Sequence, residues 1–346
     1  MPHEPPFITV VMPVRNERPF IGSVLDEILG QDYPPDRMEV LVCDGMSTDG
    51  TRELVLEYAA TDPRVRLLDN PRILSSAGRN VGFRAGRGDF FLVIDGHTRI
   101  ANPGLLRAVA DAFLDTGADC LGRPQPLLSR AEGSFSEAVA IARATPLGHD
   151  PRSLIYSSYE GFAPPGSNGA AYARHVFDRV GYVDESFDAC EDLEFNTRIE
   201  DAGLRCWTSP RLAVGYFARD TWTGLFRQML RYGCGRFLFL RKHPHHVSLP
   251  QLLPALLVGI VPAALLGALL RGPVGALLAA PALLYALAVA AYSVVLASRT
   301  RWRHLPRFLA IFPAIHLGIG LGFLLGMIRG RCTPLGGSRD VAGGAR

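Results

Sequence analysis

The carboxyl-terminal part of the chain contains three long apolar runs, and these runs restrict the possible folds more than any other feature. They cover residues 252–270, 274–297 and 308–328, and residues 252–297 contain a single charged side chain, Arg271. Each run approaches the roughly 20 residues that a helix needs to cross a bilayer. Buried helices of a soluble protein are the alternative, but three such runs in succession favour three membrane spans within residues 249–330.

The positions of the arginines suggest a topology that is not fully consistent. Positive side chains follow the second run at Arg299, Arg301, Arg303 and Arg307. The positive-inside rule places this loop, and with it the amino-terminal part, on the cytoplasmic side. Three crossings would then leave Arg329 and Arg331 outside. Either the tail is an exception to the rule, or the run at residues 252–270, which contains two prolines, is re-entrant.

Composition restricts the class of protein further. The formal net charge is only +3, which argues against a nucleic-acid-binding protein. Residues 1–6 lack the basic and apolar regions of a signal peptide, so we expect the amino-terminal part to stay in the cytoplasm of a bacterial-type cell. The six cysteines form no CxxC pair and are irregularly spaced, which predicts thiols rather than a disulfide framework or a zinc site.

Strand and helix patterns alternate in the first 220 residues. Short apolar runs predict strands at residues 7–12, 38–43, 65–68 and 90–94, and helical spacing predicts helices at residues 20–29 and 75–84. Another helix is expected to begin near Ser47, Thr48 and Asp49, with Glu53 available for a capping box. This alternation predicts an α/β domain with a doubly wound, mostly parallel sheet over residues 1–220.

Two of the predicted strands are followed by a carboxylate, Asp44 in one case and Asp95 in the other. In a parallel sheet these strand ends fall along one edge, where open α/β sheets bind ligands. Asp95 and His97 alternate, so in extended backbone their side chains would share one face. Both can bind a divalent cation, and Gly96 allows a tight turn between them. A strand that simply ends in a polar turn is the alternative.

Three later segments also carry information. A glycine-rich stretch at residues 164–172 precedes Glu191 and Asp192, which open a predicted helix, although two acids at a helix start could merely cap it. Residues 221–242 mix aromatic and basic side chains, which is typical of an amphipathic helix in a membrane interface. An ordinary surface helix is the alternative. We expect this helix and a linker to occupy residues 221–248, and a tail to occupy residues 331–346.

Taken in order, residues 7–235 resemble the family 2 glycosyltransferases of the GT-A fold. Residues 11–17 are similar to the family's opening strand and turn, residues 44–51 to its D-x-S-x-D-G-T signature, and residues 77–82 to its arginine–asparagine helix. Residues 95–97 stand at D-x-D, residues 191–192 at the acid pair, and residues 228–232 at Q-x-x-R-W. His97 replaces the final aspartate and Tyr232 the tryptophan. Together with the apolar runs, the pattern most resembles membrane-bound bacterial exopolysaccharide transferases of the succinoglycan type.

The resemblance implies a metal-dependent, inverting hexosyltransferase at the inner membrane. Its donor would be a nucleotide sugar such as UDP-glucose, and its acceptor a polyprenyl-linked or growing saccharide. The implied catalytic residues are Asp192, as base, and Glu191. The implied donor-binding residues are Pro13, Val14, Asn16, Glu17, Asp44, Arg79, Asp95 and Gly96. Gln228, Arg231 and Tyr232 would cover the diphosphate or the acceptor. Asp95 and His97 would hold Mn²⁺ or Mg²⁺, and the imidazole favours Mn²⁺.

Two other classes stay open. A nucleotidyltransferase also uses a doubly wound sheet and a metal, but it would carry a glycine-rich basic loop directly after the first strand, where this chain has residues 13–17. The second class is a non-catalytic membrane subunit or lipid-carrier partner with a degenerate transferase domain, which the histidine at position 97 keeps possible. Hydrolysis of nucleotide sugars with and without Mn²⁺ would separate these classes.

Overall fold

The computed structural model describes residues 4–150, 152–246, 249–270 and 272–330. These residues form two compact units, which are described separately. The first comprises residues 4–127 and 152–217, and the second contains residues 128–150 together with the described residues from 218 onwards. Residues 128–150 thus belong with the carboxyl-terminal helices. The domain boundaries expected from the sequence stay predictions.

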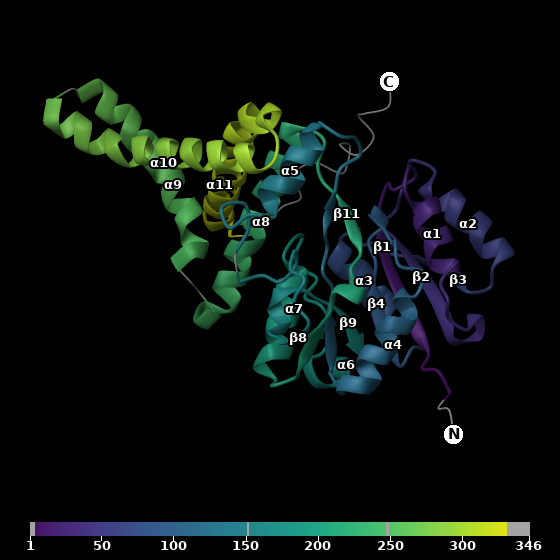
Figure 1. The fold of residues 1–346 in the computed structure, drawn as a ribbon. Coiled ribbons are helices and arrows are strands. Elements are labelled where there is room, and N and C mark those ends of the chain that lie inside the picture. Colours follow the sequence, from purple (N-terminus) through teal and green to yellow (C-terminus); the bar gives the residue numbers. More distant parts are fainter. Residues whose placement is uncertain (1–3, 151, 247–248, 271, 331–346) are drawn as a thin grey trace. The chain divides into compact units, whose positions relative to one another are not determined.

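An eight-stranded sheet forms the centre of the first unit, in the order β3-β2-β1-β4-β9-β6-β10-β8 (Figure 1). Its strands are β1 (Ile8–Val14), β2 (Met38–Asp44), β3 (Val65–Asp69), β4 (Phe90–Val93), β6 (Cys120–Gly122), β8 (Gly161–Ala163), β9 (Gly169–Ala173) and β10 (Cys206–Thr208). The strands β1 to β4 run parallel, whereas β9 is antiparallel to both β4 and β6. The predicted doubly wound, mostly parallel sheet is therefore confirmed.

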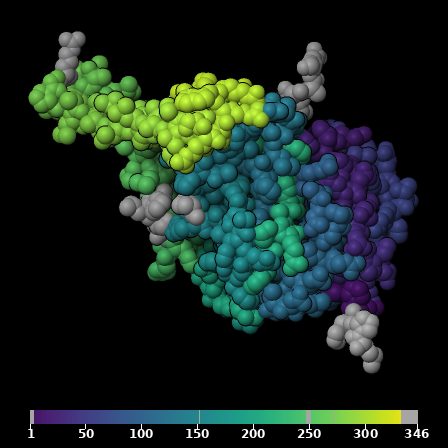
Figure 2. Space-filling view, in the orientation of Figure 1, coloured from purple at the N-terminus to yellow at the C-terminus, as the bar shows by residue number. Residues whose placement is uncertain are grey.

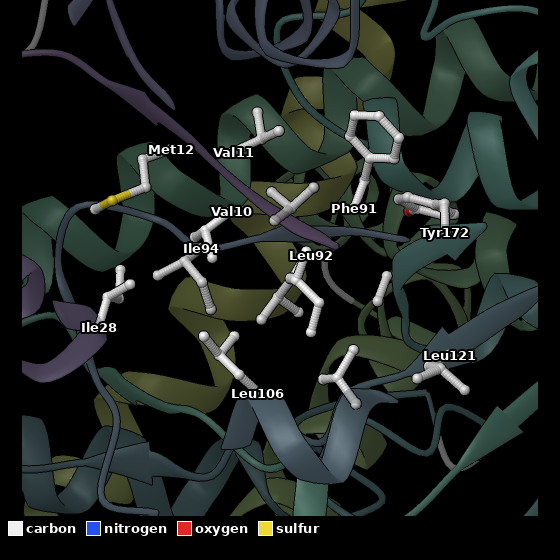
Figure 3. Packing of buried hydrophobic residues seen from close by; sticks show 14 of the residues in the cluster. Val10, Val11, Met12, Ile28, Phe91, Leu92, Ile94, Leu106, Leu121 and Tyr172 are labelled. Atoms are coloured by element: carbon white, nitrogen blue, oxygen red, sulfur yellow. The ribbon is translucent and has the colours of Figure 1, made fainter. Parts of the chain in front are cut away.

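Six helices of the described residues belong to this unit. They are α1 (Ile21–Leu29), α2 (Thr51–Thr61), α3 (Ser75–Ala85), α4 (Leu105–Thr116), α6 (Arg174–Val180) and α7 (Glu191–Asp201). The central strands are apolar on both faces because helices cover both sides of the sheet. Figure 3 shows this core, in which Val10 and Leu92 of neighbouring strands lie near Leu106 of α4.

A second, smaller sheet contains β5 (Thr98–Arg99), β11 (Gly215–Phe217) and β7 (Leu127–Leu128). In this sheet β5 and β11 are antiparallel, and Tyr216 stands opposite Thr98. Because β5 follows the Asp95–His97 segment directly, this pairing brings Tyr216 to the end of the central strand β4.

Two local predictions in this unit are wrong. The first strand does not stop before Pro13 but continues to Val14. Proline is tolerated there because β4 pairs only with the first half of β1, so no ladder bond to β4 is lost. The helix α2 has no capping box; it begins after Gly50, which has a φ of +89°. The side chains of Ser47 and Asp49 instead accept hydrogen bonds from the backbone N–H groups of Asn16 and Arg18.

The cysteines also need one correction. Cys43, Cys120, Cys190 and Cys206 are free thiols, but Cys234 is disulfide-bonded. A disulfide requires two Cα atoms within about 7 Å of each other, which irregular sequence spacing cannot reveal.

The second unit is helical in its described residues. Its helices are α5 (Phe135–Arg143), α8 (Trp222–Lys242), α9 (Leu249–Leu270), α10 (Gly272–Arg299) and α11 (Leu305–Arg329). Three stretches, Gln251–Leu270, Gly272–Arg299 and Trp302–Arg329, are long and apolar enough to cross a membrane. Leucines such as Leu269 and Leu277 are more than two-thirds exposed, and α9 and α10 form the green part of the surface in Figure 2. The three predicted apolar helices are therefore present.

The helix α8 packs closely against α11. A Cβ added to Gly322 of α11 would lie 2.1 Å from the backbone oxygen of Leu230, and one added to Gly318 would lie 2.7 Å from the Cβ of Met229. In return, a Cβ on Gly233 of α8 would lie 2.0 Å from the backbone oxygen of Ile319. Small residues allow such close helix contacts in membrane proteins. The predicted amphipathic helix thus packs on a candidate membrane span, and its interfacial location stays a prediction.

Candidate active site

The helix α3 lies close to the sheet because two of its glycines face the strands. A Cβ added to Gly82 would lie 2.3 Å from Cγ1 of Val11, and one added to Gly78 would lie 3.1 Å from the Cβ of Pro13. A larger residue at Gly82 would push the helix away from β1. This close packing fixes the positions of Arg79 and Asn80, which lie between the two glycines.

Arg79 and Asn80 connect α3 to the segment that leads into α7. The amide of Asn80 donates to the backbone oxygen of Val183 (2.8 Å) and to Oε1 of Glu185 (2.7 Å), and it accepts from the backbone N–H of Val183 (2.9 Å). Nη2 of Arg79 lies 3.3 Å from Oε1 of Glu191. The arginine–asparagine pair therefore joins the parallel half of the sheet to the acid pair.

The acid pair has one buried and one exposed member. Glu191 is 8 % exposed, whereas Asp192 is exposed and accepts a hydrogen bond from the N–H of Leu193 (2.8 Å). The cap of α7 is Cys190, which makes no side-chain cap bond. Glu191 therefore does not act as a cap, and Asp192 is the solvent-exposed member of the pair.

Three carboxylates share the charge of Arg79. Burial lowers the pKa of this guanidinium, but Glu191, Asp192 and Asp95 outweigh that effect and raise it. Burial raises the pKa of Glu191; Arg79 lowers it, while Asp192 and Asp95 raise it further. These interactions bring the end of β4 and the start of α7 together in one site, although Asp95 and Asp192 lie far apart in the sequence.

The segment Asp95–His97 forms a turn. The strand β4 ends at Val93, so the prediction that Asp95 and His97 share a face of extended backbone is wrong. The turn is held by the hydroxyl of Thr98, which donates to the backbone oxygen of Asp95 (3.0 Å). Gly96 leaves little room for a side chain, because a Cβ there would lie 3.0 Å from Cγ1 of Val14 and 3.1 Å from Cγ of Glu17.

Both ring nitrogens of His97 have partners. Nδ1 lies 2.8 Å from Oε1 of Glu17, and Nε2 contacts the hydroxyl of Tyr216. Tyr216 was not predicted, because its approach depends on the pairing of β11 with β5. Glu17 is 8 % exposed, and its Oε2 makes no hydrogen bond with the described residues.

This arrangement suits a divalent cation whose coordination shell would be completed by substrate oxygens. Metal-binding histidines usually donate their second ring N–H to a carboxylate, the place that Glu17 takes at Nδ1. Nε2 could then exchange the Tyr216 hydroxyl for a metal, with Asp95 as the second ligand. Within the described ranges no group of three or more His, Cys, Asp or Glu side chains could hold a metal ion. Two protein ligands with substrate phosphates are a common set for such cations.

Asp44 is the last residue of β2. Its carboxylate is completely buried, accepts from the N–H of Ser47 (3.2 Å) and lies 3.5 Å from Nη1 of Arg52. Asn16 has a φ of +56°, and its Oδ1 accepts from the N–H of Thr48 (2.8 Å). Val14 is in register with Asp44. The loops after β1 and β2 are thus bonded to each other beside Asp95.

Other predicted residues lie on α8, in the second unit. Nε2 of Gln228 donates to the hydroxyl of Tyr232 (3.3 Å), and the guanidinium of Arg143 stands 5.8 Å from the centre of the Tyr232 ring. Arg231 is on the same helix. The part of these three residues in substrate binding stays a prediction. One further residue of the first unit, Arg123, was not predicted; it follows β6 and is 3 % exposed.

A mixed sheet with acidic loops along the carboxyl edge of its parallel half defines a GT-A type transferase domain. Residues 5–235 match the family model described as "Glycosyltransferase like family 2", and the chain belongs to this family.

The similar proteins agree with this assignment. The chain is 31 % identical to the succinoglycan biosynthesis protein ExoA of Rhizobium meliloti over 91 % of this chain and 93 % of that protein. It is 25 % identical to a dolichyl N-acetyl-α-D-glucosaminyl phosphate 3-β-D-2,3-diacetamido-2,3-dideoxy-β-D-glucuronosyltransferase of Methanococcus voltae, over 94 % and 99 % of the two chains. The mannosyltransferase PcManGT of Pyrobaculum calidifontis, solved with GDP-Man and Mn²⁺, shares the fold. The comparison of the two structures gives a TM-score of 0.57 at 23 % sequence identity, over 92 % of this chain and 88 % of that chain.

Proposed function

We propose that this protein is an inverting hexosyltransferase of exopolysaccharide or other cell-surface glycan synthesis. It moves a hexose from a UDP-sugar, such as UDP-glucose, to a polyprenyl-linked or growing saccharide acceptor. The observation that carries the proposal is the position of Arg79 among Asp95, Glu191 and Asp192, next to the loop of Asp44. The printed function of the Rhizobium meliloti relative, succinoglycan biosynthesis, supports the glycan assignment.

Asp192 acts as the base in this proposal. Its exposed carboxylate takes the proton from the acceptor hydroxyl while that oxygen attacks the anomeric carbon of the donor. The bond from this carbon to the diphosphate oxygen breaks on the opposite face, so a single displacement inverts the configuration. A positioned general base contributes roughly 10²–10⁴-fold in rate. Glu191 is buried against Arg79 and holds the start of α7 in place.

The donor lies along the loops after β1, β2 and β4. Asp44 faces the nucleoside, and Pro13, Val14 and Asn16 form the neighbouring wall. A divalent cation held by Asp95 and His97, Mn²⁺ or Mg²⁺, would neutralise the charge that develops on the diphosphate. Glu17 orients the imidazole of His97 through Nδ1.

The apolar helices support a location of this chemistry at a membrane. The helices α9, α10 and α11 would anchor the protein in the inner membrane, with the transferase domain in the cytoplasm. A polyprenyl-linked acceptor would keep its tail in the bilayer while its sugar reaches Asp192. Gln228, Arg231 and Tyr232 of α8 would contact the acceptor or the diphosphate.

The test uses the full chain, purified in detergent, with a panel of UDP- and GDP-sugars. We expect one UDP-hexose to bind, and to release UDP in the presence of a saccharide acceptor. Binding of nucleotide sugars without any turnover would support a non-catalytic subunit. Release of pyrophosphate from UTP and a sugar 1-phosphate would show a nucleotidyltransferase.

A further inference from the structure

Arg123 is a buried cation whose guanidinium has unsatisfied hydrogen-bond donors. The residue follows β6 directly and is 3 % exposed. Nε and Nη1 of its guanidinium are buried, and neither has a hydrogen-bond partner among the described residues. Burial lowers the pKa of this guanidinium, but arginine stays charged in proteins. A buried charge of this kind is destabilising unless something compensates it.

Arg64, in the same unit, is an example of an arginine with a structural role. Arg64 is paired with Asp62, with Nη2 2.6 Å from Oδ2, and its Nη1 donates to the backbone oxygen of Leu29 (3.2 Å). Its charge is thus balanced within the folded chain. Arg123 has no such set of partners, so the fold alone does not explain why a cation stands at this position.

The surroundings of Arg123 place it at the active site. The charge of Asp95 is close enough to stabilise the guanidinium, while that of Arg79 opposes it. Its backbone N–H donates to the oxygen of Asn168 (2.9 Å), which fixes the residue between β6 and β9. Two buried guanidinium groups therefore share one region with Asp95, and the two unpartnered nitrogens of Arg123 are donors that a ligand oxygen in this region would satisfy.

The strand order indicates where that anion lies. Asp44 ends β2, Asp95 follows β4, and Arg123 follows β6, on the far side of β4 from β2. A nucleotide sugar with its nucleoside at Asp44 and its phosphates near Asp95 would direct the sugar-bearing phosphate towards Arg123. Arginine suits phosphate because its planar fork donates two parallel hydrogen bonds.

We propose that Arg123 binds the phosphoryl oxygens of a substrate, in the first place those of the donor diphosphate next to the sugar. The inference rests on the proposed function, because it takes a nucleotide sugar as the ligand. A phosphoryl group could also come from a polyprenyl-linked acceptor, so the experiment includes both sources.

The experiment compares full-length wild type with Arg123→Met and with Arg64→Met as a matched control. Methionine keeps much of the length of arginine and removes the charge. Binding of UDP, uridine and farnesyl phosphate is measured by calorimetry in detergent, with Mn²⁺ and with EDTA. The Tm of each ligand-free protein is measured in parallel.

We expect Arg123→Met to weaken UDP binding by about 10- to 100-fold, the range for a hydrogen bond to a charged group. The loss should persist in EDTA, and uridine, which lacks phosphate, should bind unchanged. The Tm of ligand-free Arg123→Met should equal or exceed that of wild type, because buried hydrogen-bond donors without partners are removed. Arg64→Met should lower the Tm and leave UDP affinity unchanged.

Other outcomes decide the source or overturn the proposal. Weakened farnesyl phosphate binding with unchanged UDP binding would keep the phosphoryl site and assign it to the acceptor. If wild type binds UDP and Arg123→Met binds UDP and farnesyl phosphate with unchanged affinity, the inference is overturned and the proposed function stands. A wild-type protein that binds none of these probes would overturn both.

Discussion

Nη2 of Arg79 lies 3.3 Å from Oε1 of Glu191, and the two side chains are only 12 % and 10 % exposed. This contact joins α3, which packs on the parallel strands, to α7, which carries the proposed base. The same guanidinium interacts with Asp95 and Asp192. One arginine thus interacts with all three acids of the candidate site.

Removing Arg79 should destabilise the fold. In Arg79→Gln the carboxylate of Glu191 would stay buried without its counter-ion, and breaking a buried pair from one side costs about 3–5 kcal/mol. The control is Arg84→Gln on the same helix. Its side chain is exposed, and Glu185 keeps Arg72 as a partner, so this loss should be less than ~1 kcal/mol. Urea unfolding in detergent measures both, and equal losses would show that the Arg79–Glu191 contact is not stabilising.

Glu191 should make stability depend on pH. Its folded-state pKa is raised, so above the ordinary glutamate value of about 4.3 the folded protein binds more protons than the unfolded chain. Stability therefore falls as the pH rises from about 4.3 through the folded-state pKa. Glutamine cannot titrate, so the Tm of Glu191→Gln minus that of wild type should become more positive between about pH 4 and pH 7. The exposed Glu200→Gln on the same helix controls for the Glu-to-Gln change, and a constant difference for Glu191→Gln would contradict the raised pKa.

The sequence predicts those features that depend on local patterns. Apolar runs predict the central strands, and the carboxylates after them place Asp44 and Asp95 at one edge of the sheet. Features that depend on the pairing of distant segments could not be predicted. Tyr216 reaches His97 because β11 pairs with β5, and Arg123 reaches the site because β6 pairs with β9.

The capping box at α2 was a wrong prediction for a related reason. Residue type alone makes Ser47 and Asp49 good caps. In the fold both side chains bond to the backbone of the loop after β1, and Asp49 also accepts a hydrogen bond from the N–H of Thr51, so contacts between loops add to the local one.

Replacing the proposed base should affect chemistry and leave the fold intact. Asp192→Asn keeps the size and the capping ability of the side chain but cannot accept the acceptor's proton. We expect normal UDP-sugar binding and a kcat at least roughly 100-fold lower, measured with the donor found in the panel. Asp201→Asn, at the other end of α7, is the control and should retain activity. Near-normal turnover of Asp192→Asn would indicate that another residue is the base, with Glu191 as the next candidate.

Turnover should depend on a metal ion that is bound by Asp95 and His97. Asp95→Ala should abolish turnover, since it removes a carboxylate ligand next to the diphosphate. His97→Asp should stay active and shift the preference from Mn²⁺ towards Mg²⁺, because oxygen ligands suit the harder cation. Titration of each metal into chelator-treated protein measures this preference. Full activity of Asp95→Ala in excess chelator would contradict the assignment.

The contact between α8 and α11 should be needed for a stable second unit. A side chain at Gly322 would meet the backbone oxygen of Leu230, so α8 would have to move. Overpacking of this kind costs typically about 1–3 kcal/mol, and Gly322→Leu should lower the Tm in detergent accordingly. Gly259→Leu on α9 is the matched control, because a Cβ there meets no atom within 4 Å. Both variants should stay in the membrane fraction, since neither interrupts an apolar run. Equal Tm values for the two variants would show that α8 does not pack on α11 in solution. A lower Tm for Gly322→Leu alone would show that a candidate membrane span holds α8, the helix that carries Gln228 and Arg231.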